Sequence, residues 1–337
     1  DSYLVNAHVP RFGSGEAKGV IDESVRGMDL YILVDVCNYS LTYSMSGNTN
    51  HMSPDDHYQN LKRIIAAVGG KAKRINVIMP FLYESRQHKR SSRESLDCAL
   101  ALQELTHMGV DNIITFDAHD PRVQNAIPLS GFETVRPTYQ FVKGLLDRYD
   151  DLIIDSDHMM AISPDEGATE RAVYLANVLN LDMGMFYKRR DYTRVVNGRN
   201  PIVAHEFLGS SVEGKDVIIL DDMISSGDSI LDVAKQLKSR NAKRIFAAAT
   251  FGLFTNGLDK FDEAYESGLI DGVLTTNLIY QTPELLSRPY YINCDMSKYV
   301  ALMIDTLNHD GSISDILDPS ERIQVCVEEY KKAHGQL

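Results

Sequence analysis

Cysteine is scarce in this sequence: only Cys37, Cys98, Cys294 and Cys326 are present, widely spaced and without a CxxC pair. This spacing argues against a disulfide framework or a cysteine zinc site and favours a reducing compartment. No apolar run reaches membrane-spanning length, and the first residues show no signal-peptide pattern. We therefore expect a cytoplasmic protein with no membrane partner. The chain does not begin with Met, which is compatible with further residues upstream.

Basic residues are outnumbered, since Lys and Arg total 34, Asp and Glu total 47, and the net charge is −13. This balance argues against a nucleic-acid partner, because the phosphate backbone attracts basic surfaces. Hydrophobic residues make up 44% and charged residues 24%, as in ordinary globular proteins. The length of 337 residues exceeds what one hydrophobic core usually supports, so we expect two domains.

Short apolar runs rich in Val and Ile alternate with amphipathic segments of helix length. This alternation predicts an α/β fold with mainly parallel sheets covered by helices on both faces. The expected strands span 29–36, 74–81, 112–118, 152–164, 183–189, 216–222, 244–251 and 272–279. The expected helices lie near 55–68, 93–108, 167–179, 228–239, 258–267 and 297–308.

One tetrapeptide occurs twice, in AKRINVIMPF from Ala72 and in AKRIFAAATF from Ala242. Each copy follows an expected helix and opens an expected strand. Chance similarity of two helix–strand junctions would explain the repeat by itself. Together with the length and the α/β alternation, it favours two related domains that meet near residues 140–150.

The segment VIILDDMISSGDSI places two adjacent acids, Asp221 and Asp222, where an apolar strand ends. Ligands of parallel sheets bind beyond the carboxyl ends of strands, and small residues let backbone N–H groups approach a phosphate at a helix start. The small or polar residues that follow are Ser225, Ser226, Gly227, Asp228 and Ser229. An ordinary turn in which Ser and Asp cap the helix explains this segment equally well.

Three other segments carry candidate site residues. Arg86, Lys89, Arg90 and Arg93 follow an expected strand and suit a triphosphate, or else form a solvated basic turn. His119 follows another expected strand, although a lone His is more often a satisfied surface residue. On a regular strand, Lys188 and Arg190 point to the same face and could stabilise one anion, or else line a charged strand edge.

Taken together, these motifs resemble known proteins. VIILDDMISSGDSI resembles the phosphoribosyl-pyrophosphate loop of type I phosphoribosyltransferase folds. More narrowly, the chain from 11 to about 308 is similar to the ribose-phosphate pyrophosphokinase family. The segments that carry this resemblance, in family order, are 11–33, 83–94, 116–124, 163–172 and 187–191. The resemblance implies two phosphoribosyltransferase-like domains, at 1–145 with the helix 297–308 and at 146–296, followed by an extension at 309–337.

The resemblance also implies a role for each site residue. The residues that match ATP-binding positions are Phe12, which would stack on adenine, Ser14, Arg86, Gln87 and His88. The family commonly has Asp at position 88. His119 and Asp165 match the residues that hold Mg²⁺, and Lys188 and Arg190 match the catalytic cations. Asp221 and Asp222 match the acids that bind the ribose hydroxyls, and Ser225, Ser226, Gly227, Asp228 and Ser229 match the loop for the 5-phosphate.

The implied activity is transfer of the diphosphoryl group of ATP to ribose 5-phosphate, in a homo-oligomer built of dimers and possibly a hexamer. The alternatives are a phosphoribosyltransferase and a catalytically silent regulatory homologue. Asp228 stands where the family has Gly, and we expect its carboxylate to point outward at the helix start. Residues 42–57 form an insertion, and the segment from 191 to 207 is expected to be a mobile lid.

Overall fold

The structure is a computed structural model that describes residues 3–190 and 202–336, without the side chains of 188–190 and 202–205. The chain divides into two compact units, each with its own sheet. Unit 1 consists of Asp1–Arg136, Leu278–Tyr280 and Ser297–Ile313, and unit 2 consists of Pro137–Asn277, Gln281–Met296 and Ser314–Leu337. The α/β fold class with two parallel-sheet domains is confirmed. In the described part of the chain, no helix is long and apolar enough to cross a membrane.

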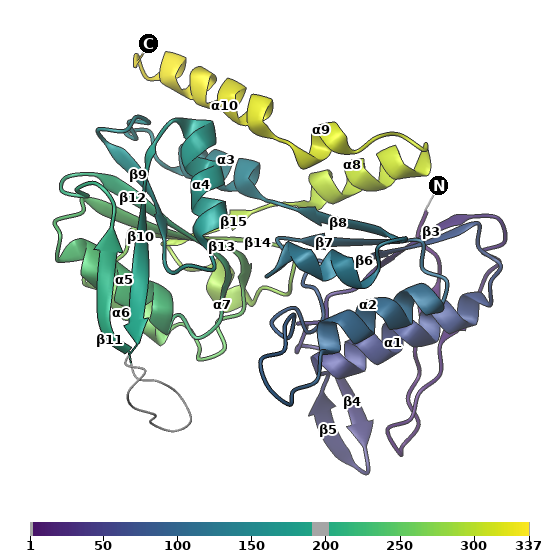
Figure 1. The fold of residues 1–337 in the computed structure, drawn as a ribbon. Coiled ribbons are helices and arrows are strands. Elements are labelled where there is room, and N and C mark those ends of the chain that lie inside the picture. Colours follow the sequence, from purple (N-terminus) through teal and green to yellow (C-terminus); the bar gives the residue numbers. More distant parts are fainter. Residues whose placement is uncertain (1–2, 191–201, 337) are drawn as a thin grey trace. The chain divides into compact units, whose positions relative to one another are not determined.

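Unit 1 is built on a four-stranded parallel sheet in the order β3-β6-β7-β8. Its strands are β3 (Asp29–Leu33), β6 (Arg74–Ile78), β7 (Asn112–Phe116) and β8 (Gly131–Val135). Helices α1 (Pro54–Val68) and α2 (Asp97–His107) cover one face, and α8 (Ser297–Asn308) covers the other (Figure 1). The central strands β6 and β7 are buried almost throughout because both faces are covered, as their unbroken Val and Ile runs predict.

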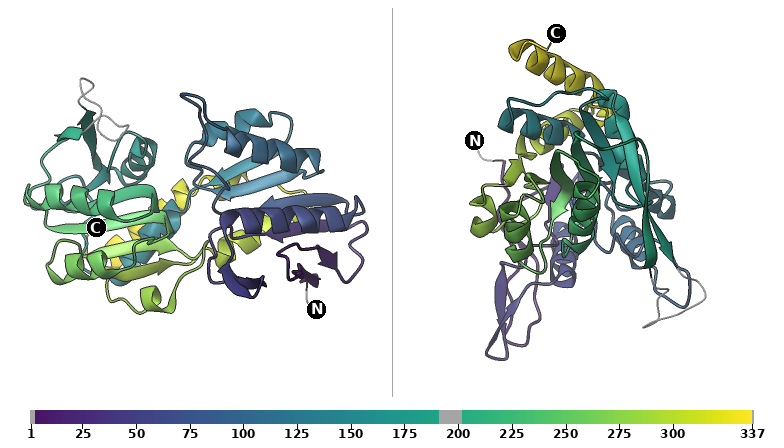
Figure 2. Two further views of the ribbon diagram at one scale, coloured as in Figure 1. Left: turned by 90° about the horizontal axis from the view of Figure 1, so that it is seen from below. Right: turned by 90° about the vertical axis from the view of Figure 1, so that its left-hand side faces the viewer.

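Smaller elements complete unit 1. They are β1 (Ala7–His8), β2 (Val20–Ile21), β4 (Thr42–Met45), β5 (Asn48–His51) and the 3₁₀ helix η1 (Pro121–Ala126). The insertion predicted at 42–57 folds into the hairpin β4–β5, which projects from unit 1 as an arm (Figures 1 and 2), and the first turn of α1. Ser46 and Gly47 form its two-residue turn with φ of 50° and 80°, the backbone that suits the twist of a hairpin.

Unit 2 contains a seven-stranded sheet in the order β11-β10-β9-β12-β13-β14-β15, parallel except for β11. Its strands are β9 (Met159–Ser163), β10 (Asp182–Arg190), β11 (Ile202–Leu208), β12 (Asp216–Ile224), β13 (Arg244–Gly252), β14 (Gly272–Thr276) and β15 (Tyr291–Cys294). Its helices are α3 (Thr138–Arg148), α4 (Thr169–Leu179), α5 (Asp228–Lys238), α6 (Asp259–Glu266), α7 (Pro283–Leu286), α9 (Ser314–Leu317) and α10 (Ser320–Ala333).

Alternation along β12 shows how the core of unit 2 is layered. Ile218 and Leu220 face a cluster that includes α3, α4 and α10. Val217 and Ile219 face a second cluster that includes α5 and α6. Because successive strand residues point to opposite faces, β12 is apolar on both faces from Val217 to Leu220, and it lies in the middle of the sheet. Its carboxyl end is therefore firmly placed.

The repeated tetrapeptide lies at the same set of contacts in both units. Arg74 donates two hydrogen bonds to Asp29, its partner in register on the neighbouring strand, at 2.7 and 2.6 Å. Arg244 donates two to Asp216 in the same way, at 2.9 and 2.7 Å. The next residue of each strand donates its backbone N–H to the Asp just before the following strand, at 2.8 Å in both units. The repeat therefore reflects a duplicated architecture, and chance similarity no longer needs to be invoked.

Three expected elements differ from the structure. The strand predicted at 152–164 is shorter, because Asp155 accepts backbone N–H groups at 157 and 158 and turns the chain before β9 begins. The expected lid at 191–207 lies partly outside the described residues, and its part from 202 forms β11, paired with β10. The domain boundary expected at 145/146 falls inside α3, which belongs to unit 2.

The C-terminal extension is part of the core of unit 2. Helix α10 packs against α3 and α4, with Ile323 fully buried and Val327 and Tyr330 almost so. The Tyr330 hydroxyl accepts the N–H of Leu152 at 3.0 Å and donates to the carbonyl of Tyr149 at 2.8 Å. One hydroxyl thereby satisfies two backbone groups of the turn that follows α3.

We expect Tyr330→Phe to destabilise unit 2 by about 1–3 kcal/mol, because it leaves buried backbone groups without partners. Urea denaturation followed by circular dichroism measures this. The matched control is Tyr174→Phe, which removes a 3.4 Å hydrogen bond to Asp318 at the surface and should cost under about 0.5 kcal/mol. Equal stability of the two variants would contradict the anchoring role of Tyr330.

Candidate active site

The carboxyl end of β12 leads into the 225–229 loop and then into α5. The strand continues to Ile224, because Met223 and Ile224 remain paired with β13. The strand expected at 216–222 is therefore two residues longer, and the small residues from Ser225 onwards follow it. Gly227 has φ +84°, and a Cβ there would lie 2.4 Å from the Phe261 ring. Only glycine fits this approach, which brings the start of α5 close to α6.

The two acids on β12 lie in an unfavourable electrostatic environment. Asp222 is buried and Asp221 is partly buried, and the Asp222 N–H donates to Asp221 Oδ1 at 2.8 Å. Burial, together with the neighbouring carboxylates of Asp222 and Asp165, raises the pKa of Asp221 well above its usual value. A cation or a set of hydroxyl donors bound at this place would lower this repulsion.

Asp165 lies at the same edge of the sheet, in the loop between β9 and α4, and β9 pairs directly with β12. Its Oδ1 accepts the backbone N–H groups of Gly167 at 3.0 Å and Ala168 at 3.3 Å. The Ser163 hydroxyl donates to the Asp165 carbonyl at 2.6 Å. The side chain is therefore held at the helix start, close enough to influence the pKa of Asp221.

Asp228, the residue that departs from the family pattern, is exposed in the first turn of α5. Its carboxylate accepts a hydrogen bond from Lys260 Nζ at 2.5 Å and one from the Ser226 hydroxyl at 3.0 Å. The partner lysine comes from α6. Its charge lowers the pKa of Asp228 and offsets the negative charge that Asp228 adds beside the loop. Ser225 and Ser226 are partly buried, and Ser229 is exposed.

Lys188 and Arg190 lie near the end of β10, the strand next to β9. In the pairing with β11, the register shifts between Arg189 and Arg190. The side chains of these residues lie outside the described part of the chain, so the same-face arrangement stays a prediction. The backbone of β10 runs parallel to that of β9, so β10 and β12 end at the same edge of the sheet.

In unit 1, His119 follows β7 and lies beside the nucleotide-loop candidates. The ring of His88 is 5.3 Å from that of His119, and its Nε2 is 3.5 Å from Asp120 Oδ2. Arg122 in turn donates to Asp120 at 2.5 Å. Burial is the main reason that the pKa of His88 is lowered. The structure thus brings His88 and His119 together with Asp120, the neighbour of His119 in the sequence, and with the cation of Arg122.

The other nucleotide candidates lie in two loops of unit 1. Arg86 is exposed, and Gln87 donates to the Ser95 carbonyl at 2.7 Å. Phe12 exposes 54% of its surface, in a turn where the Ser14 hydroxyl donates to Glu16 at 2.9 Å.

The proposed metal ligands His119 and Asp165 belong to different units, so their joint role stays a prediction. Within the described residues, no group of three or more His, Cys, Asp or Glu side chains is arranged to hold a metal ion. The donor types nevertheless suit Mg²⁺, since Asp165 and the β12 acids supply carboxylate oxygens.

Sequence reasoning missed Lys260 and Arg122 as neighbours of the candidate site. The adjacency of Asp120 to His119 in the sequence already places that acid beside the site. Lys260 is 32 residues from Asp228 and meets it only through the packing of α6 against α5. No local pattern would have identified this contact.

The fold and the loop at the end of β12 define an α/β protein of the phosphoribosyltransferase type, and residues 136–276 match a family model described as a phosphoribosyl transferase domain. Residues 1–109 match a model described as the N-terminal domain of ribose phosphate pyrophosphokinase. A ribose-phosphate pyrophosphokinase of Mycoplasma genitalium is 31% identical, over 80% of this chain and 74% of its own. One from Shewanella oneidensis is 30% identical, over 92% of this chain and 90% of its own. This chain belongs to the ribose-phosphate pyrophosphokinase family.

A solved structure agrees with this assignment at the level of the fold. The crystal structure of phosphoribosylpyrophosphate synthetase from Mycobacterium smegmatis superposes with a TM-score of 0.75. The match covers 91% of this chain and 92% of that one, at 24% identity.

The raised pKa of Asp221 predicts a pH-dependent stability. Ionising this group at neutral pH costs folding free energy, so its contribution to stability is lost as the pH rises through its folded-state pKa. We expect Asp221→Asn to raise the free energy of unfolding by about 1 kcal/mol near pH 8, with a gain that shrinks as the pH falls towards 4. Urea titrations between pH 5 and 8 test this, with the exposed Asp232→Asn on α5 as control. A gain that does not change with pH would disprove it.

Proposed function

We propose that this protein is a ribose-phosphate diphosphokinase. The 1-hydroxyl oxygen of ribose 5-phosphate attacks the β-phosphorus of ATP, and the bond from that phosphorus to the α,β-bridging oxygen breaks. The products are phosphoribosyl pyrophosphate, AMP and the proton of the hydroxyl. The observation that carries the proposal is the family match along nearly the whole chain, N-terminal domain included. A phosphoribosyltransferase would leave the loop with Arg86 and Gln87 without a role.

The sugar phosphate would bind at the carboxyl end of β12. Asp221 and Asp222 are acceptors for the ribose hydroxyls, and hydroxyl donors there would relieve the repulsion that raises the pKa of Asp221. The 225–229 loop offers backbone N–H groups and hydroxyls to the 5-phosphate at the start of α5. These positions orient the sugar so that its 1-hydroxyl can be aligned with ATP.

The nucleotide would bind to unit 1, through Arg86, Gln87 and His88, with Phe12 stacked on the adenine. Lys188 and Arg190 would stabilise the charge that develops on the transferring group. His119 and Asp165 would hold Mg²⁺, which when bound neutralises phosphate charge and orients the phosphate oxygens. We also infer a cytoplasmic homo-oligomer, with ATP and ribose 5-phosphate as its small-molecule partners.

The decisive experiment incubates the purified protein with ATP, ribose 5-phosphate and Mg²⁺ and measures AMP by chromatography. We expect AMP and phosphoribosyl pyrophosphate in equal amounts. Lys188→Ala should lower kcat by about 10²- to 10³-fold, because it removes a cation that acts on the transition state, and should change the KM values less. Turnover within about threefold of wild type would contradict the catalytic role of Lys188.

The same assay, followed by a nucleotide titration and by incubation with added phosphoribosyl pyrophosphate, separates the alternatives. A silent regulatory homologue gives no AMP but still binds nucleotide, and a phosphoribosyltransferase gives no AMP but consumes phosphoribosyl pyrophosphate.

The ion pair between Lys260 and Asp228 predicts an effect on sugar-phosphate binding. Lys260→Met leaves the Asp228 charge uncompensated beside the 5-phosphate. The KM for ribose 5-phosphate should rise by about threefold to tenfold at low salt, and less at high salt, since ions screen exposed charges. Adding Asp228→Asn should restore the KM. The control is Lys143→Met, which removes an exposed pair with Asp147 on α3 and should leave the KM unchanged. A failure of Asp228→Asn to restore the KM would rule out this explanation.

A further inference from the structure

The insertion hairpin β4–β5 touches the loop that carries Phe12. The Ser46 N–H, in the hairpin turn, donates to the Gly13 carbonyl at 2.9 Å. Gly15 has φ +92°, and a Cβ there would lie 2.7 Å from Met45 Sδ. The tip of the hairpin therefore lies directly against the Phe12 loop.

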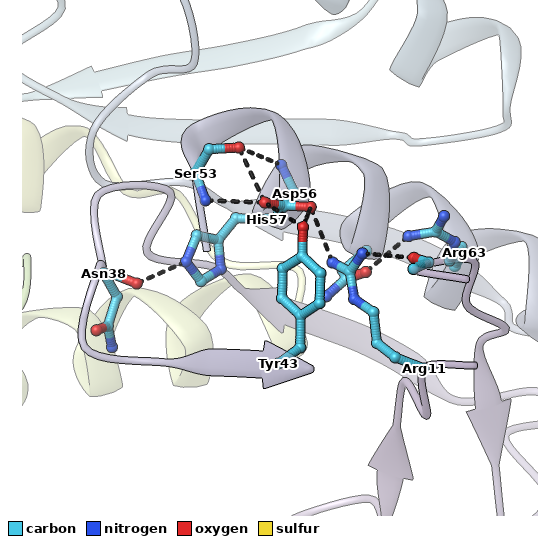
Figure 3. Close-up of polar contacts among 9 residues, drawn as sticks. Arg11, Asn38, Tyr43, Ser53, Asp56, His57 and Arg63 are labelled. Atoms are coloured by element: carbon cyan, nitrogen blue, oxygen red, sulfur yellow. Dashed lines mark hydrogen bonds and ion pairs between the residues drawn. The ribbon is translucent and has the colours of Figure 1, made fainter. Parts of the chain in front are cut away.

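A second set of contacts joins the base of the hairpin, the loop and α1 (Figure 3). The Arg11 guanidinium lies 3.9 Å from the centre of the Tyr43 ring and donates to Asp56 Oδ1 at 3.0 Å. The Tyr43 hydroxyl also donates to Asp56 Oδ1, at 3.3 Å. Arg11 reaches back to the loop as well, donating to the Gly15 carbonyl at 3.0 Å. One carboxylate thus connects the hairpin and the loop to a helix.

Asp56 itself is fixed by the cap of α1. The Ser53 hydroxyl accepts the Asp56 N–H at 3.2 Å, and the Ser53 N–H donates to Asp56 Oδ2 at 3.0 Å. Partial burial opposes ionisation, but the hydrogen bonds from Ser53 and Arg11 outweigh it and lower the pKa of Asp56. The Arg11 and Asp56 side chains are only 12% and 19% exposed. A charge pair so shielded from water is more strongly coupled than an exposed one.

These contacts restrain the loop that carries Phe12. Its N–H donates to the Glu16 carbonyl at 2.7 Å, and its carbonyl accepts the Gly15 N–H at 2.9 Å, which closes a tight turn. The ring itself remains 54% exposed. A rigid backbone that presents a large exposed aromatic ring is suited to stack on a flat ligand, because little conformational freedom is lost on binding.

We propose that the hairpin β4–β5 positions Phe12 for the adenine base of ATP, with Arg11, Tyr43 and Asp56 as positioning residues. This inference rests on the proposed function, since it assigns the base to Phe12. The insertion thereby gains a role in nucleotide affinity, by holding the Phe12 loop in its binding conformation before ATP arrives.

The test compares Tyr43→Leu with wild type by calorimetric titration with ATP and Mg²⁺ and by steady-state kinetics. We expect ATP affinity to fall by about fivefold to tenfold, the scale of part of a base–aromatic stack. The KM for ribose 5-phosphate and kcat at saturating ATP should change less than about twofold. Arg11→Met should have the same effects on ATP affinity, KM and kcat as Tyr43→Leu. The matched control is Lys62→Met, since Lys62 also pairs with a carboxylate, Glu104, and lies over a tyrosine ring, that of Tyr58.

A double-variant cycle tests whether Tyr43 affects ATP affinity through Phe12. With Phe12→Ala already present, Tyr43→Leu should lower ATP affinity by less than about twofold further, because the two changes act through the same ring. Additive losses, or equal rises in the KM for both substrates, would overturn the positioning role while leaving the proposed activity standing. A wild type that binds ATP but makes no AMP would overturn the activity and leave the positioning role to the titrations. A wild type that binds no ATP would overturn both.

Discussion

Repulsion among the carboxylates of Asp221, Asp222 and Asp165 is the constraint that decides what can bind at the carboxyl end of β12 in unit 2. The sheet holds the first two on a buried central strand and the third in the loop that follows the neighbouring strand, although this arrangement opposes the ionisation of Asp221. Such an arrangement costs stability unless a ligand relieves it. Under the proposed function, hydroxyl donors or a divalent ion bound here would relieve the repulsion, so the feature that disfavours folding would also favour substrate binding.

A duplicated Arg–Asp pair lies at the opposite edge of each sheet. In each unit the paired residues begin adjacent strands, Asp29 with Arg74 and Asp216 with Arg244. They fix the strand register at the amino edge, opposite the edge where candidate ligand loops emerge. The carboxyl edge is thereby left to the site, and its loops can vary in sequence while the sheet keeps its register. Ligand sites at the carboxyl ends of the strands are expected of parallel α/β sheets.

The sequence predicted those features that are set locally. The apolar strands, the acids at the end of β12 and the loop of small residues follow from patterns within a few positions, and family resemblance assigned their roles. Contacts between distant segments were not predictable, as with Lys260 and Asp228 or Ser46 and Gly13, because they depend on how finished elements pack. Helix α10 was missed, although Ile323, Val327 and Tyr330 follow the i, i+4, i+7 spacing of a buried face.

Both departures from the family pattern are compensated locally. Asp228 adds a negative charge beside the 225–229 loop, and Lys260 on the next helix pairs with it. His88 replaces an acid in the nucleotide region, where burial lowers its pKa and so disfavours its positive charge, and Asp120 lies 3.5 Å away. A chain that had lost catalysis would have no need to keep such balances beside its substrate loops. The pairing of Asp228 with Lys260 therefore favours the active enzyme over the silent homologue.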